Sequence, residues 1–80
     1  MGVLEEVGGH LVRLRTQAGL DPDGAAAATQ IPVERLSEAE AGLIALTEDE
    51  LGVVARAYGV DTTEIFGGHI TRFQDYAGGA

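Results

Sequence analysis

Signals that start and stop helices divide this chain at short intervals. Asp21 followed by Pro22 is a start signal, because the aspartate oxygen can accept a hydrogen bond from a free backbone N–H and proline fits the first helical position. The runs TEDE (47–50) and DTTE (61–64) are capping boxes. Glycines that can end a helix stand at positions 19, 42 and 59. Start and stop signals at these intervals leave room for short helices only. No run shows the strict alternation of apolar and polar residues that is typical of a strand.

We therefore predict an all-α fold of five short helices. They are expected at residues 9–18, 22–28, 33–41, 47–58 and 62–66. An apolar stripe begins earlier, at Leu4, but the pair Gly8 and Gly9 weakens a helix, so we place the first start near residue 9. The domain is then residues 9–66, with a lead-in at 1–8 and a tail at 67–80. The predicted core consists of Leu11, Leu14, Ile31, Leu36, Leu51, Val54, Tyr58, Ile65 and Phe66.

The amino-acid composition limits the partners and the chemistry that this chain can have. With 80 residues the chain forms one domain, which at this size buries only about 60% of its unfolded surface. A net charge of −8, with arginines as the sole basic residues besides two histidines, repels nucleic acid and anionic membranes. The absence of cysteine excludes disulfides, thiolate chemistry and cysteine-based zinc sites. No apolar run approaches the roughly 20 residues of a membrane span. We expect a soluble cytoplasmic protein that does not bind membranes.

The order of these segments resembles the Xre-like helix-turn-helix family, which includes phage repressors, Cro proteins and many bacterial regulators and antitoxins. The runs that carry the resemblance are LVRLRTQAGL (11–20), DPDGAAAATQIPVERLSEAEAG (21–42) and LTEDELGVVARAYGVDTTEIF (46–66). The resemblance covers residues 9–66 without a gap and implies a lambda-repressor-like fold. It also implies that the third helix reads base edges in the major groove. The matching positions in this chain, our candidate recognition helix, are Val33, Glu34, Arg35, Ser37 and Glu38.

The residues at these positions are unusual for a DNA reader. The family holds a phosphate at the start of the second helix, where this chain has Pro22, which offers no N–H. Glu34 and Glu38 lie one helical turn apart, and Arg35 can pair with Glu38. Further phosphate contacts implied by the resemblance would fall to Arg13 and Arg15. A face with so few arginines is expected to bind duplex DNA weakly.

The loop after the third helix reads LIAL (43–46), where the family is usually basic. We predict that some of these side chains are exposed and take part in a protein interface. The tail adds a second apolar series three residues apart. The candidate interface residues are Leu43, Ile44, Leu46, Ile70, Phe73 and Tyr76. The plainer alternatives are that the glutamates form an ordinary solvated face and that the loop packs into the core. Ala25 and Ala39, small residues for a core, make additional burial by a partner more plausible.

The sequence is compatible with two functional hypotheses, and neither is enzymatic. No nucleophile stands at a suggestive spacing from a base, and neither His10 nor His69 has the spacing of a metal ligand, so we expect no cofactor, metal or small-molecule substrate. The favoured hypothesis is a regulatory helix-turn-helix protein in transcription control. It would act through contacts with itself or a partner regulator and bind DNA weakly. The alternative is a sequence-specific DNA-binding regulator or antitoxin that acts as a dimer.

Overall fold

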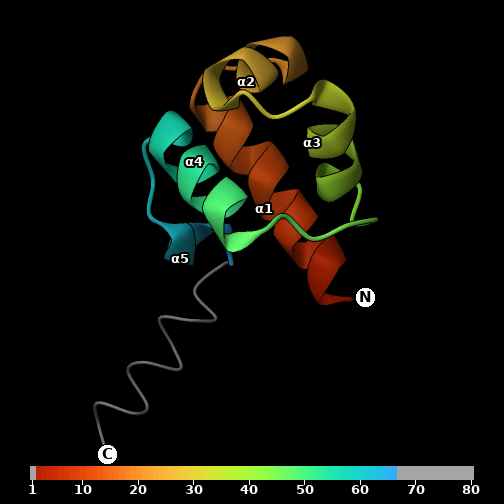
Figure 1. The fold of residues 1–80 in the computed structure, drawn as a ribbon. Coiled ribbons are helices and arrows are strands. Elements are labelled where there is room, and N and C mark those ends of the chain that lie inside the picture. Colours follow the sequence, from red (N-terminus) through yellow and green to blue (C-terminus); the bar gives the residue numbers. More distant parts are fainter. Residues whose placement is uncertain (1, 67–80) are drawn as a thin grey trace, which may run out of the picture.

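The structure is a computed structural model that describes residues 2–66 of the chain. In this part of the chain it contains five α-helices and no strands (Figure 1). The helices are α1 (Val3–Gln17), α2 (Pro22–Thr29), α3 (Val33–Glu40), α4 (Glu48–Tyr58) and α5 (Thr62–Ile65). The predicted all-α class is thereby confirmed, and four of the five helices lie within a few residues of their expected positions.

The first helix starts earlier than predicted. α1 begins at Val3 instead of near residue 9, so residues 3–8 belong to the helix. Its first turn is closed by the Glu5 carboxylate, which accepts a hydrogen bond of 3.0 Å from the N–H of Gly2. Gly8 is buried because α1 crosses the end of α3 there: an added Cβ would lie 2.8 Å from the carbonyl oxygen of Ala39. The glycine that weakens the helix locally is therefore needed for its packing.

The helices are arranged around α1. In Figure 1, α1 runs through the middle of the molecule, with α3 on one side, α4 and α5 on the other, and α2 across one end. α1 packs against α3 and α5, α2 packs against α3 and α4, and α4 packs against α5. The starts of α1 and α4, together with α5, lie at the end away from α2 (Figure 1). α2 and this end therefore lie apart, while the end of α3 packs against α1 between them.

Most of the predicted core is buried. The buried members are Leu11, Leu14, Ile31, Leu36, Val54, Tyr58 and Ile65. Leu51 and Phe66 are only half-buried: Leu51 packs against the buried cluster, whereas the assignment of Phe66 to the core is corrected. Both line an apolar groove at the end of the molecule away from α2. Leu46 and the alanines 25, 39 and 55 complete the buried cluster. The alanines each bury little apolar surface, so the core depends on a few large side chains.

The capping boxes form as predicted. The Thr47 hydroxyl accepts a hydrogen bond of 3.1 Å from the N–H of Glu50, whose carboxylate accepts one of 2.8 Å from the N–H of Thr47. At the second box, the Glu64 carboxylate accepts from the N–H of Asp61 at 3.2 Å. These bonds satisfy backbone donors that have no partner inside the helix. They fix the starts of α4 and α5, and with them the path of the connecting segments.

Candidate nucleic-acid and protein interfaces

The turn between α2 and α3 is held by a buried threonine that the sequence reading overlooked. α2 ends at Gln30, whose backbone is left-handed (φ 60°), and α3 starts three residues later at Val33. The Thr29 hydroxyl donates a hydrogen bond of 2.8 Å to the carbonyl of Ala25 and accepts one of 3.2 Å from the N–H of Ile31. Thr29 is 4% exposed. A hydroxyl directly before the turn was the available signal, because threonine often bonds to nearby backbone at such positions.

The outward face of α3 is acidic. Glu34, Ser37 and Glu38 are exposed, whereas Val33 and Arg35 are half-buried. The three exposed positions are those that the resemblance assigns to base reading. Two of the three side chains are carboxylates, which repel phosphate and can accept only from a base amino group.

The one arginine of α3 forms an ion pair with the start of α4. The Arg35 Nε lies 2.6 Å from one carboxylate oxygen of Glu50, and its Nη2 lies 2.7 Å from the other. The expected hydrogen bond with Glu38 is not formed, because Glu50 offers both oxygens to the planar guanidinium. The Arg35 hydrogen bonds and the bond from Thr47 lower the pKa of Glu50 to about 2. The positive charge in the recognition segment is thus neutralised within the domain.

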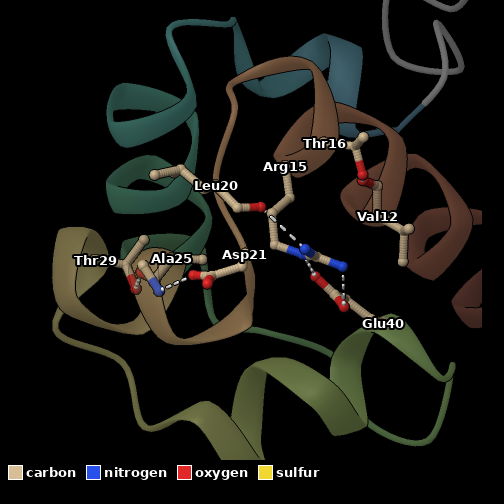
Figure 2. A network of polar contacts seen from close by, with 9 residues as sticks. Val12, Arg15, Thr16, Leu20, Asp21, Ala25, Thr29 and Glu40 are labelled. Carbon is tan, nitrogen blue, oxygen red and sulfur yellow. Dashed lines mark hydrogen bonds and ion pairs between the residues drawn. The ribbon is translucent and has the colours of Figure 1, made fainter.

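Arg15 is also engaged inside the molecule. Its Nε donates to a Glu40 carboxylate oxygen at 2.8 Å, and its Nη1 donates to the Leu20 carbonyl at 3.0 Å. Figure 2 shows the guanidinium between these two groups, joining α1, the end of α3 and the segment before α2. Both side chains of the pair are 14% exposed, and the bond with Glu40 raises the pKa of Arg15. A phosphate contact by Arg15, expected from the resemblance, does not fit this placement.

Arg13 is exposed, but its position on α1 is unfavourable. Its Nη2 lies 3.0 Å from Nδ1 of His10. Arg13 precedes Arg15 by two residues, which places it roughly on the opposite side of the helix from the contact with α3. A DNA duplex held along α3 would not easily reach it.

A carboxylate of the chain itself caps the start of α2. The Asp21 carboxylate accepts a hydrogen bond of 2.7 Å from the N–H of Gly24, and Pro22 occupies the first helical position. Asp23 is exposed beside them. The positive end of a helix is a common phosphate site, but here a carboxylate occupies it and one N–H is missing. Both the head of α2 and the face of α3 are therefore poorly suited to phosphate.

The large side chains of the apolar loop (43–46) differ in how far they are exposed to solvent. Leu43 is 70% exposed, Ile44 is half-buried and Leu46 is 8% exposed. The prediction that some are exposed is confirmed for Leu43, and the alternative of inward packing holds for Leu46. Gly42 permits the sharp exit from α3, with φ 78°, and packs against Glu5. Leu43 therefore lies next to the first turn of α1.

An apolar groove opens between the start of α1, residues 43–46 and the start of α4; we call it the α1–α4 groove. Its volume is about 240 Å³. Its principal lining residues are Val3, Leu4, Val7, Ile44, Leu46, Leu51 and Phe66. Val3 is 69% and Leu4 is 39% exposed. The other three candidate interface residues, Ile70, Phe73 and Tyr76, lie outside the described residues. The sequence pattern did not reveal this groove.

Neither a metal site nor a membrane span is found among residues 2–66. No group of three or more histidine, aspartate or glutamate side chains there could hold a metal ion. In the same part of the chain, no helix is both long and apolar enough to cross a membrane.

The fold and the turn between α2 and α3 define a small helix-turn-helix domain. A family model of the helix-turn-helix domain matches residues 6–65, and the chain belongs to this family. Such domains are typical of DNA-binding regulatory proteins. No curated protein matches the chain in sequence.

Proposed function

We propose that this protein is an Xre-like regulator without enzymatic activity that acts mainly through protein contacts and binds duplex DNA weakly. The observation that carries the proposal is the charge of the helix-turn-helix face. Glu34 and Glu38 are exposed there, and Asp21 caps the start of α2. The nearby arginines 15 and 35 are paired with Glu40 and Glu50.

The weak DNA binding follows from the number of phosphates that the face can neutralise. Each neutralised phosphate contributes about 0.9 to the slope of log K against log salt concentration. Arg13 is far from the α3 contact face, and Arg15 would have to leave Glu40 before it could bind a phosphate. We expect a slope magnitude of about 1 to 3, which corresponds to one to three phosphates.

A salt titration with fluorescent duplex DNA tests this proposal. The Glu34→Gln, Glu38→Gln double variant should bind duplex more tightly than the unchanged protein, because two repulsive charges are removed. Asp49→Asn serves as the control, since it removes an exposed carboxylate on α4, outside the helix-turn-helix. Tight binding by the unchanged protein near physiological salt, with a steep slope, would instead support the alternative function.

The alternative is a sequence-specific DNA-binding regulator or antitoxin that acts as a dimer. Membership of the helix-turn-helix family is compatible with it. In that case the reading positions would be Val33, Glu34, Ser37 and Glu38, with cytosine amino groups and thymine methyl groups as their partners. A selection from random duplexes distinguishes the two functions, because only the alternative predicts enrichment of one sequence.

The proposed protein contact lies at Leu43 and the exposed start of α1. Leu43 and Val3 are among the most exposed large apolar side chains of the described residues. Apolar patches of this kind on small domains usually mark association sites, and burying one such side chain contributes about 1.5 to 3 kcal/mol before association entropy. The partner is a second copy or another regulator.

Sedimentation of Leu43→Asp measures this contact. The substitution should weaken self-association, or capture of the partner, and leave the helical circular dichroism unchanged. Val12→Asp is a suitable control, because Val12 is 37% exposed on α1 and does not line the α1–α4 groove. A protein that stays monomeric at high concentration and whose partner binding is insensitive to Leu43→Asp would contradict the proposed contact.

A further inference from the structure

The α1–α4 groove is large enough to receive side chains from another protein. An engineered apolar cavity of about 150 Å³ binds benzene, so a groove of about 240 Å³ has room for one aromatic and one short aliphatic side chain. Its walls are almost entirely apolar, from Leu4 on α1 to Leu51 on α4. Apolar side chains that enter the groove would remove these walls from water, which is favourable.

The wall formed by α1 has the length of about two helical turns. It consists of Val3, Leu4, Val7 and Leu11, whose spacing places them on one face of α1. From the first to the last of these residues the helix rises by about 12 Å. A helix laid along this wall presents side chains one turn apart, about 6 Å from each other, on the side that faces the groove. The groove therefore suits a helix with two apolar side chains at this spacing, a common form of helix recognition.

Acidic side chains flank the groove. Glu5 and Glu6 lie in the first turn of α1, and Glu48 and Asp49 lie in the first turn of α4. All four are exposed. Neither of these turns nor the loop at residues 43–46 contains a basic residue. An occupant with lysine or arginine beside its apolar side chains is complementary to this charge, whereas an acidic occupant is repelled.

The same charges disfavour a second copy of the chain as the occupant. A two-fold contact uses the same surface on both copies, so it would bring the acids around one groove close to the acids around the other. Like charges placed opposite each other across an interface oppose association. The net charge of −8 adds a repulsion between any two copies at low salt. A different protein with a basic surface carries no such cost.

We propose that the α1–α4 groove binds a basic amphipathic helix of another protein. Two apolar side chains of that helix, one turn apart, insert between α1 and α4, and its lysine or arginine side chains lie next to Glu48 and Asp49. Leu43, beside the first turn of α1, extends the apolar contact. This inference rests on the proposed function, because it names the class of partner that binds at the start of α1.

A phage-displayed library of short helical peptides tests the chemistry of the occupant. The residues on one face of each peptide and those flanking it are randomised, and binding peptides are selected on the immobilised full-length chain. We expect enrichment of peptides with two large apolar residues three or four positions apart and with lysine or arginine beside them. The affinity of a selected peptide should fall as salt rises, because salt screens the exposed charges.

Two matched variants locate the selected peptide in the groove. Leu4→Gln should weaken its binding by about tenfold or more in fluorescence anisotropy, because an apolar contact is lost. Val12→Gln should leave binding unchanged, since Val12 has a similar exposure, 37% against 39% for Leu4, but does not line the groove. Circular dichroism confirms that each variant is folded.

A second pair of variants tests the charge. The Glu48→Gln, Asp49→Asn double variant should weaken binding of the selected peptide by about two- to thirtyfold, as expected for two exposed ion pairs. The Glu34→Gln, Glu38→Gln double variant removes the same charge from α3, outside the groove, and should bind the peptide as the unchanged protein does.

Three results would overturn the inference. The first is that no peptide is enriched, or that peptides without basic residues are enriched equally. The second is peptide binding that Leu4→Gln does not weaken. The third is self-association in sedimentation that Leu4→Gln abolishes, which assigns the groove to a second copy. If Leu43→Asp weakens association and no peptide binds the groove, the inference alone fails. If the peptide binds and association is insensitive to Leu43→Asp, the contact at Leu43 fails instead.

Discussion

The two adjacent glycines of α1 should differ in their response to the same substitution. In a helix interior, Gly→Ala stabilises by about 0.5–1 kcal/mol because the unfolded chain loses conformational freedom. Gly9 is exposed, and an added Cβ there meets no atom within 4 Å, so Gly9→Ala should show this full gain. At Gly8 the added Cβ would lie 2.8 Å from the Ala39 carbonyl oxygen and closer still to that of Glu40.

The contact at Gly8 involves backbone atoms, which cannot rotate away as a side chain does. Overpacking of this kind costs about 1–3 kcal/mol. Because the helical gain is common to both variants, Gly8→Ala should be less stable than Gly9→Ala by the same amount, about 1–3 kcal/mol. For a domain of this size each kcal/mol changes the melting temperature by about 4–8 °C.

Thermal unfolding followed by circular dichroism measures the difference directly, and urea unfolding gives the free energies. Gly9→Ala should melt above the unchanged protein, and Gly8→Ala should melt below Gly9→Ala. If both variants gain the same stability, α1 does not cross the end of α3 at this distance, and the argument for Gly8 is refuted.

Three further predictions concern the polar contacts. The pKa of Glu50, about 2 in the folded state against 4.5 ordinarily, means that its ion pair contributes fully above about pH 4.5. This contribution is lost as the pH falls toward 2; a carboxyl NMR titration midpoint near 4.5 would contradict it. A double-mutant cycle with Arg15→Ala and Glu40→Ala should give a coupling of about 1–3 kcal/mol, and a value near zero would show that the pair adds nothing to stability. Thr47→Ala should lower the unfolding free energy by about 1 kcal/mol in urea, whereas Thr62→Ala should cost less because the N-cap of α5 is Asp61 and not Thr62.

The sequence predicted where most helices begin and end because those signals act within one turn. Thr47 and Glu50 satisfy each other's backbone donors three residues apart, and Asp21 bonds to the N–H three residues on. The apolar spacing of Leu11 and Leu14 likewise needs only the helical repeat to put them on one face. Such signals are local, so they can be recognised in the sequence before the fold is known.

The first helix shows where local reasoning failed. Gly8 lowers helix propensity wherever it stands, and in our prediction this signal outweighed the apolar stripe that begins at Leu4. The end of α3, more than 30 residues later, lies against Gly8 and makes a small residue necessary there. Packing of this kind overrides the weak local preference of a single residue.

The sequence by itself determined the all-α class, the five helices, the acidic residues at the base-reading positions of α3 and the apolar loop. These features follow from composition and from spacings of a few residues. The tertiary structure decided the partners of Arg15 and Arg35, with Glu40 and Glu50 lying 25 and 15 residues away along the chain. It also separated Leu43, which faces water, from Leu46, which enters the core. Ion pairs and burial depend on which helices meet in space, and that depends on the packing of the whole domain, which no short stretch of sequence specifies.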